Sequence, residues 1–283
     1  MLRCRRCGVH VTAEIDGRPP GSEAGGGDYY SALDLADYAA YYEPFRLRVF
    51  RDNWRWIAAR APNGLALDVG TSFGWFLRAA PPGWQVRGLE PAPEVAAGDR
   101  AAGLDVRTGG VEALAGDPDR YDLITLWNVF EHLPEPRRVL RAIHDRLQPG
   151  GLLALSVPNR LGLYNRLGYF AAAAGLSDPL HTLFQVDNPG PHLFHYARRD
   201  LRRLLRGAGF EIIEVVAQPI VDLRTLALRG RLERGRSLAA SRIGRALLIG
   251  AYGLSRLLRL PDEIAVYARA GYTSPTTVER GPS

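Results

Sequence analysis

Lysine is absent from this 283-residue sequence, and all 36 basic side chains are arginines. Cysteine occurs only at Cys4 and Cys7, which excludes a framework of disulfide bonds. No apolar run reaches the roughly 18 residues of a membrane-spanning helix. The N-terminus has no apolar stretch behind its basic residues and so is not a secretory signal; we expect a cytoplasmic protein.

The rest of the composition is that of an ordinary globular protein with a full core. Apolar residues make up 46% and charged residues 23% of the chain, and the net charge is +6. The positive surplus is concentrated in the last third, at Arg198, Arg199, Arg202, Arg203, Arg206, Arg224, Arg229, Arg231, Arg234, Arg236, Arg242, Arg245, Arg256 and Arg259. This bias either favours anionic partners or forms a solvated basic face, and the sequence leaves both open.

The segment Cys4-Arg-Arg-Cys7 has the form of half a zinc ribbon. A structural zinc ion needs four ligands and only His10 could add a third nearby, so no metal site is predicted. Residues 16–28 are rich in glycine and proline, which predicts a flexible linker. We therefore expect a degenerate zinc-knuckle fragment and linker over residues 1–28, then an aromatic helical cap over residues 29–60.

Apolar strands and helices alternate over residues 61–159. Strands are predicted at residues 64–70, 84–90, near Val106, at 121–127 and at 151–158, with helices at 73–80, 93–103 and 134–147. A sixth strand at residues 211–219 and a last strand at 262–270 follow later. The alternation predicts an α/β fold with a doubly wound, mostly parallel sheet and helices on both faces.

The most informative motif is Leu67-Asp-Val-Gly-Thr-Ser-Phe-Gly74, at a predicted strand-to-helix turn. Gly70 and Gly74 allow a tight turn and a close approach to a ligand. Asp68 is at the carboxyl end of the first strand, where doubly wound sheets bind ligands. The Gly-x-Gly-x-x-Gly spacing of dinucleotide sites is missing, and an acidic residue here would repel phosphates. The turn therefore suits a cofactor that carries an ammonium and a sulfonium.

Glu90 ends the second predicted strand, about twenty residues after the glycine turn. A carboxylate at this place in nucleotide-binding α/β folds accepts hydrogen bonds from both hydroxyls of a ribose. Asp68 and Glu90, each at the end of a strand, together indicate a cofactor site with much more weight than a glycine turn alone.

These motifs resemble those of the class I S-adenosylmethionine-dependent methyltransferases, among them the ubiquinone-biosynthesis O-methyltransferases and many natural-product and sugar methyltransferases. The likeness covers about residues 29–218 and the last strand, and it is carried by residues 65–77, 86–94, 121–159 and 192–212. It implies a Rossmann-like seven-stranded sheet that forms a cofactor-binding core over residues 61–159.

The resemblance also implies S-adenosyl-L-methionine as the cofactor and assigns its contacts. They would be Asp68, Gly70, Thr71 and Gly74 at the methionine and ribose, Glu90 at the ribose hydroxyls, Val111 and Glu112 on the adenine side, and Asn128 near the methionine end. The sequence departs from the family pattern at Ser72, where glycine is common, and at Gly110, where an acidic residue often contacts the adenine.

Methyl transfer from a sulfonium is an in-line displacement, for which the enzyme supplies orientation and excludes water. An oxygen acceptor also has to lose a proton, and histidine suits this task near neutral pH. His132, just past the fourth strand, is the first candidate for this base, and His192 and His195 are the second. Glu131 and His132 alone are too few ligands to predict a metal.

The remaining segments would shape the acceptor pocket. Residues 160–218 are predicted to hold an acceptor-side insert and the sixth-strand unit, and residues 219–261 a basic amphipathic helical insertion; residues 271–283 would be a disordered tail. Within the insertion, residues 236–260 suit a helix on a membrane surface, but equally a helix that caps the cleft or is buried in a dimer.

We therefore predict a methyltransferase that acts on a small-molecule acceptor, at oxygen; a lipid-linked compound or a glycan would fit. The alternatives are a nicotinamide-dependent oxidoreductase and a non-catalytic cofactor-binding scaffold. A nucleic-acid acceptor is not expected, since neither an Asn-Pro-Pro-Tyr or Asp-Pro-Pro-Tyr motif nor an RNA-binding module is present.

Overall fold

The computed structural model describes residues 2–3, 9–12, 35–61, 63–175, 191–219 and 242–271. The predictions for Cys4, Cys7, the linker at residues 16–28 and the tail beyond residue 271 lie outside these ranges. None of the described helices is both long and apolar enough to cross a membrane.

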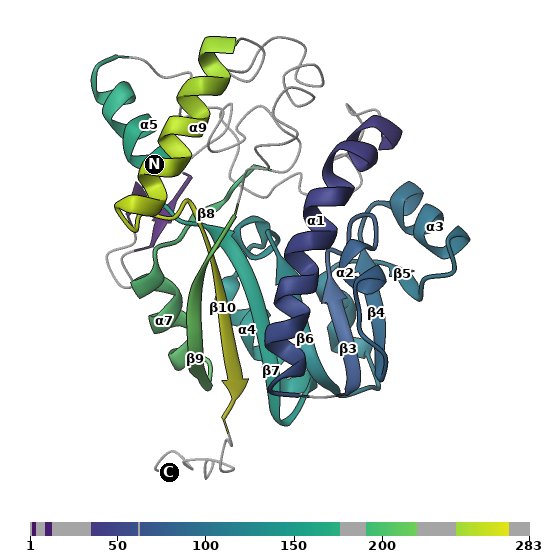
Figure 1. The fold of residues 1–283 in the computed structure, drawn as a ribbon. Coiled ribbons are helices and arrows are strands. Elements are labelled where there is room, and N and C mark those ends of the chain that lie inside the picture. Colours follow the sequence, from purple (N-terminus) through teal and green to yellow (C-terminus); the bar gives the residue numbers. More distant parts are fainter. Residues whose placement is uncertain are drawn as a thin grey trace, which may run out of the picture.

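A seven-stranded sheet forms the centre of the protein, with its strands in the order β5–β4–β3–β6–β7–β10–β9 (Figure 1). The strands are β3 (Gly64–Val69), β4 (Trp84–Glu90), β5 (Val106–Thr108), β6 (Tyr121–Trp127), β7 (Leu147–Pro158), β9 (Phe210–Gln218) and β10 (Glu263–Ala270). Strands β3 to β7 pair in parallel, whereas β10 runs antiparallel to both β7 and β9. The predicted mostly parallel, seven-stranded sheet is confirmed.

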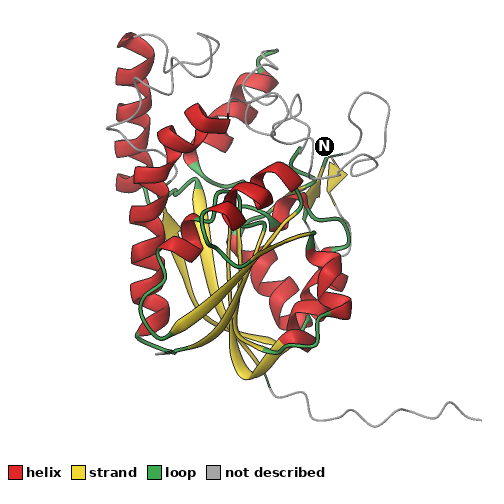
Figure 2. Ribbon diagram, turned by 90° about the vertical axis from the view of Figure 1, so that its right-hand side faces the viewer, coloured by secondary structure: helices red, strands yellow, loops and turns green. Residues whose placement is uncertain are grey.

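Helices cover both faces of this sheet, as the side view shows (Figure 2). The described helices of four or more residues are α1 (Leu35–Ala58), α2 (Trp75–Arg78), α3 (Pro93–Ala101), α4 (Pro136–Arg146), α5 (Leu163–Ala173), α7 (Arg198–Gly207) and α9 (Arg242–Leu257), besides a 3₁₀ helix at Val111–Gly116. Helix α1 is the expected N-terminal cap, and α9 lies in the expected insertion before the last strand.

The two faces are built from alternating residues of the central strands, because successive side chains of a strand point to opposite sides. On one face, Ala66 and Leu123 pack with Trp54 of α1. On the other, Leu67 and Ile124 pack in the cluster that contains buried residues of α4 and α7. Fully burying a large apolar side chain contributes roughly 1.5–3 kcal/mol, so these two clusters account for much of the driving force for folding.

The N-terminal segment pairs with a strand far along the chain, which the sequence did not predict. Strand β2 (His10–Val11) pairs antiparallel with β1 (Leu2–Arg3) on one side and with β8 (Phe194–His195) on the other. Val9 is 3% exposed and belongs to the main core cluster. Residues 9–12 are therefore packed on the globular unit rather than forming part of a separate fragment.

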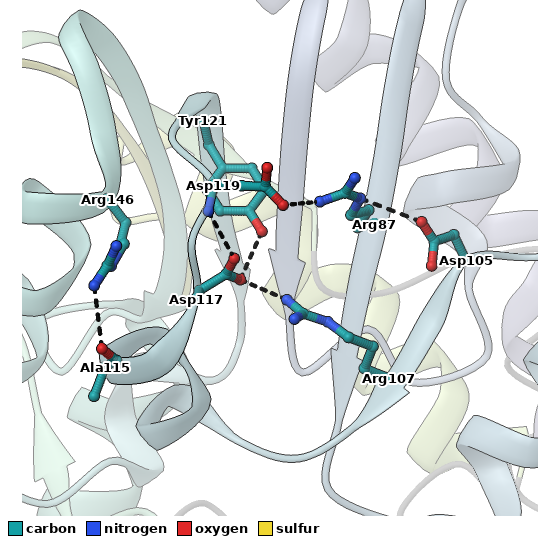
Figure 3. Close-up of polar contacts among 8 residues, drawn as sticks. All are labelled: Arg87, Asp105, Arg107, Ala115, Asp117, Asp119, Tyr121 and Arg146. Atoms are coloured by element: carbon teal, nitrogen blue, oxygen red, sulfur yellow. Dashed lines mark hydrogen bonds and ion pairs between the residues drawn. The ribbon is translucent and has the colours of Figure 1, made fainter.

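A network of charged groups ties the loop after β5 to the start of β6 (Figure 3). The buried Asp117 carboxylate accepts hydrogen bonds from the Tyr121 hydroxyl at 2.7 Å and from Arg107 Nη2 at 2.5 Å. Burial alone would raise the pKa of Asp117, but the bonds from Arg107 and Tyr121 lower it below its usual value. Arg87 extends the network to Asp119 and Asp105.

We expect Asp117→Ala to lower the free energy of unfolding by roughly 3 kcal/mol, because it leaves the buried Tyr121 hydroxyl without its acceptor and removes a charge-assisted bond from Arg107. Asp105→Ala is the matched control: its carboxylate is 64% exposed and also pairs with an arginine, so its loss should change stability by less than about 1 kcal/mol. Unfolding in urea measures the free energy of unfolding of both variants. Equal effects of the two variants would contradict the prediction.

Candidate active site

The turn between β3 and α2 holds three residues in the left-handed backbone region: Gly70 at φ 73°, Ser72 at φ 52° and Gly74 at φ 61°. A Cβ atom on Gly70 would lie 2.5 Å from Val129 Cγ2, and one on Gly74 would lie 2.2 Å from Leu104 Cδ1. Both glycines are thus required by backbone conformation and by close packing. Ser72 occupies a conformation that glycine adopts more readily, which accounts for glycine being common there.

Asp68 lies beneath this turn and is 2% exposed. Its carboxylate accepts hydrogen bonds from Thr125 Oγ1 at 2.5 Å and from Thr71 Oγ1 at 2.9 Å. Burial raises the pKa of Asp68 to about 7, although the two hydroxyl bonds act in the opposite direction. Thr71 therefore orients the acid, and a nearby cation would restore its charged form.

Glu90 ends β4, directly beside β3, and is 3% exposed. The Ser72 amide donates to Oε2 at 2.8 Å, and the Ala92 amide donates to Oε1 at 2.9 Å. Burial raises the pKa of this carboxyl group despite both amide bonds. A carboxylate has about four acceptor positions, so each oxygen keeps one for a further donor. These two remaining acceptor positions fit a ribose, whose two adjacent hydroxyls would donate one hydrogen bond to each oxygen.

Asp99 is a third buried carboxyl group at the turn, and the sequence reasoning missed it. It projects from α3, is 6% exposed, and its Oδ1 lies 3.1 Å from the position a Cβ on Gly74 would take. Burial, followed by the charge of Glu90, raises its pKa to about 7. The helical spacing of Asp99 could have indicated its burial, because Asp99 lies on the same face of α3 as the buried Val95 and Ala96.

The predicted adenine-side residues follow β5, the strand next to β4. Val111 is half-buried and packs against the main core, whereas Glu112 is exposed. The Gly110 amide donates to Glu112 Oε1 at 2.7 Å, so the Glu112 side chain folds back over Gly110. A carboxylate is thereby present beside the position where the family often has an acidic residue.

Asn128 follows β6 and adopts a left-handed conformation at φ 57°, which asparagine tolerates better than most residues. Its Oδ1 accepts a hydrogen bond from Ser156 Oγ at 3.0 Å, and its Nδ2 donates to Glu263 Oε2 at 3.4 Å. Glu263 was not predicted. It begins β10, is 5% exposed, and has a pKa raised by burial.

The three predicted histidines come together beyond the carboxyl ends of β6 and β7. The ring centres of His132 and His192 are 4.9 Å apart, and those of His192 and His195 are 6.3 Å apart. His132 Nδ1 lies 3.0 Å from the Pro191 carbonyl oxygen. A carbonyl only accepts, so Nδ1 carries the proton in the neutral ring and Nε2 carries the lone pair.

Thr12 of the N-terminal segment fixes the tautomer of His195, in which Nε2 carries the proton. The Thr12 hydroxyl donates to the His192 carbonyl at 2.7 Å and therefore accepts from His195 Nε2 at 3.0 Å. Burial, aided by the nearby charges of His10 and Arg160, lowers the pKa of His195 to about 3. His195 is therefore neutral at pH 7 and a weak base.

Glu131 is a buried carboxyl group next to His132. It is 1% exposed, its Oε1 lies 3.9 Å from His132 Nε2, and burial raises its pKa to about 8. The sequence by itself places only one carboxylate and one imidazole here, at Glu131 and His132. The structure adds His192, so that ligand atoms of Glu131, His132 and His192 all lie within 4.8 Å of one another.

Residues 41–215, more than half of the chain, match the family model of a methyltransferase domain. The ubiquinone biosynthesis O-methyltransferase of Burkholderia thailandensis is 28% identical over 192 residues, which cover 63% of this chain and 78% of that protein. Its namesake from Xanthomonas campestris pv. campestris is 37% identical over 115 residues, 37% of this chain and 48% of that protein.

Two solved structures show the same fold. A SAM-dependent methyltransferase from Thermotoga maritima superposes with a TM-score of 0.53 at 15% identity, over 87% of this chain and 99% of the other. The plantazolicin methyltransferase BamL, solved with a triazolic desmethylPZN analogue and SAH, gives a TM-score of 0.55 at 12% identity, over 87% of this chain and 94% of the other. At such low identity these likenesses concern the fold alone.

Proposed function

Because the chain belongs to the methyltransferase-domain family and is an S-adenosylmethionine-dependent methyltransferase, we propose that it methylates a small-molecule acceptor at a hydroxyl oxygen. Family membership argues against the nicotinamide-dependent oxidoreductase and the inert scaffold. The observation that carries the oxygen acceptor is the group of Glu131, His132 and His192. Glu131 and His132 follow β6, the strand that pairs with β3 ahead of the glycine turn.

The cofactor, when bound, supplies an electrophilic methyl group on a sulfonium. In this proposal Glu90 holds the ribose hydroxyls, Asp68 and Asp99 offer negative charge to the cationic part, and Thr71 keeps Asp68 oriented. Val111 and Glu112 border the adenine, and Asn128, fixed by Ser156 and Glu263, borders the methionine end. Gly70 and Gly74 keep the turn in the conformation that brings these groups together.

His132 is the proposed general base. Its Nε2 would take the proton of the acceptor hydroxyl as the oxygen attacks the methyl group. His192 would position the ring of His132, with which it is in contact. His195 would shape the pocket wall, since its low pKa makes it a poor base.

We assign the acceptor pocket to residues 160–218 and 219–261, of which α5 and α9 lie beyond the carboxyl ends of the parallel strands (Figure 1). On α9 the apolar side chains of Leu247, Leu254 and Leu257 are exposed and lie near one face of the helix, and Arg242 and Arg256 are exposed as well. These features support a lipid-linked acceptor and contact of α9 with a membrane surface. They do not bear on a glycan acceptor.

A methyl-transfer assay tests the oxygen acceptor. The purified protein would be incubated with S-adenosylmethionine carrying a labelled methyl group and with phenols, sugars and hydroxylated lipid-linked compounds. Each compound would be paired with its analogue in which the hydroxyl is already methylated. We expect label in a hydroxylated compound and none in its blocked partner. Transfer only to amines would contradict the proposal.

Cofactor affinity should rise with pH. The raised pKa means that Asp68 is protonated below about pH 7 in the free protein, whereas a bound ammonium or sulfonium favours the carboxylate, so binding releases a proton. We expect the affinity for S-adenosylhomocysteine to increase up to about tenfold per pH unit between pH 5.5 and 7, and then to level off. Calorimetry in buffers of different ionisation enthalpy measures this release. Asp68→Asn should reduce the slope to the part that Asp99 contributes, and an unchanged slope in that variant would contradict the assignment.

A further inference from the structure

A cleft of about 860 Å³ lies at the edge of the molecule that carries α7. Figure 1 shows α7 and β9 at one side of the sheet and α2, α3 and β5 at the other, so this cleft is remote from the glycine turn. Five arginines of α7 line it: Arg198, Arg199, Arg202, Arg203 and Arg206. Arg166 of α5 and Arg259, just ahead of β10, complete its basic wall, and no acidic side chain is among the described residues that line it.

The arrangement on α7 is unfavourable for the helix by itself. Leu201, Leu204 and Leu205 are buried against the core, and all five arginines are exposed. Arg198 and Arg202 are four residues apart, as are Arg202 and Arg206. Like charges at this spacing destabilise a helix by roughly 0.2–0.5 kcal/mol for each pair. An anion between the arginines would remove this repulsion.

The acidic residues next to the cleft are buried and engaged elsewhere. Asp200 is 3% exposed, accepts a hydrogen bond from the Ala197 amide and pairs with the buried Arg160 at 3.2 Å. Asp262 is 6% exposed and accepts from the Tyr164 amide at 2.7 Å. Apart from a 3.6 Å approach of Arg199 to Asp200, these two acids do not offset the charge of the cleft.

Of the two arginines outside α7, Arg166 is held by a hydrogen bond to the backbone, and Arg259 has an unusual backbone conformation. Arg166 Nε donates to the Leu161 carbonyl at 2.9 Å. Arg259 adopts a left-handed conformation at φ 54°, which is uncommon for this residue type and is kept only where the surroundings impose it. Leu161, Leu260 and Pro261 add an apolar end to the cleft, so it also suits a ligand that continues into hydrocarbon.

We propose that this arginine cleft is a binding site for a phosphate or diphosphate group. Guanidinium groups stay charged at all physiological pH values and match phosphate oxygens with paired N–H donors. Phosphate binds through these donors whether it belongs to a soluble phosphorylated compound or to a lipid headgroup. Most of the lining residues fall within residues 160–261, to which the proposed function assigns the acceptor pocket, but the inference does not rest on methyl transfer, and its test measures binding alone.

Calorimetric titration of the full-length protein with inorganic diphosphate tests the site. The informative variant is Arg202→Gln with Arg206→Gln. The matched control is Arg137→Gln with Arg141→Gln, which removes two exposed arginines at the same spacing from α4. We expect diphosphate to bind the wild type and the control alike, and to bind the α7 variant at least about tenfold more weakly. Binding of S-adenosylhomocysteine by each variant shows that it is folded.

Vesicles of phosphatidylcholine, with and without phosphatidylglycerol, distinguish the two sources. If the protein binds the anionic vesicles and diphosphate competes with this binding, the ligand is a lipid headgroup. If the protein binds diphosphate but not the vesicles, the ligand is a soluble phosphorylated compound. Three results would overturn the proposal: no binding of diphosphate to the wild type, equal weakening in the α7 variant and the α4 control, or binding to anionic vesicles without binding of diphosphate. The last would indicate diffuse surface charge rather than a site.

Discussion

Glu90→Ala should weaken the binding of S-adenosylhomocysteine about 100-fold or more. The variant removes both acceptors proposed for the ribose hydroxyls, and hydrogen bonds to a charged group contribute about 1.5–3 kcal/mol each. It also removes the acceptor for the Ser72 and Ala92 amides, so the turn itself becomes less well ordered. A loss of roughly 3 kcal/mol corresponds to slightly more than two orders of magnitude in the dissociation constant.

Two further variants separate the ribose contact from the support of the turn. Glu90→Gln keeps one acceptor oxygen and nearly the same shape, so its affinity should lie between those of the wild type and the alanine variant. Glu94→Ala removes an exposed acid from the first turn of α3 and should bind like the wild type. Calorimetry measures the affinity of all three variants for S-adenosylhomocysteine, and an unchanged far-UV circular dichroism spectrum shows that each is folded. Affinity of Glu90→Ala within threefold of the wild type would contradict the role of Glu90.

The positions of Asp68 and Glu90 could be predicted because their cause is local. Each follows a short apolar strand, and the carboxyl ends of neighbouring parallel strands meet at one edge of a sheet. The same logic placed Asn128 and His132 after β6. Strand and helix bounds were reproduced closely, except that α2 begins only at Trp75, after Gly74, and β7 begins at Leu147, directly after α4.

Glu263 and Thr12 could not be predicted, because long-range packing places them. Glu263 reaches Asn128 through the antiparallel pairing of β10 with β7, across 135 residues of sequence. Thr12 reaches His195 through β2 and β8, across 183 residues. No periodicity or short motif indicates such pairings. Asp99 is an intermediate case, since its helical spacing was visible but its burial depends on the turn at Gly74.

These long-range contacts also distinguish His132 from His195, two of the three candidate histidines. The Pro191 carbonyl sets the tautomer of His132, and Thr12 sets that of His195. Burial then keeps His195 neutral, whereas the His132 side chain remains 22% exposed beside a buried carboxyl group. The choice between candidate bases therefore follows from hydrogen-bond partners that lie outside any local motif.

His132→Asn should lower kcat for the oxygen acceptor about 10²–10³-fold, in the range that general-base catalysis contributes. KM for S-adenosylmethionine should change little, because the proposed cofactor contacts are elsewhere. The pH profile of kcat should lose the ionisation that the imidazole contributes. His195→Asn is the control: a base with a pKa of about 3 holds a proton too weakly to matter at pH 7, so this variant should lose less than about tenfold.

Glu131, His132 and His192 could instead share a metal ion. Treatment with a chelator shows whether His132 acts as a base or as a metal ligand. If His132 acts as the base, EDTA leaves the wild-type rate unchanged and only the substitution abolishes the ionisation in the pH profile. If EDTA lowers kcat as far as His132→Asn does, and zinc or magnesium restores it, the imidazole acts through a cation and the proposed base is wrong. Equal kcat values for His132→Asn and His195→Asn would likewise contradict the assignment, since the two rings differ in exposure, tautomer and neighbouring charge.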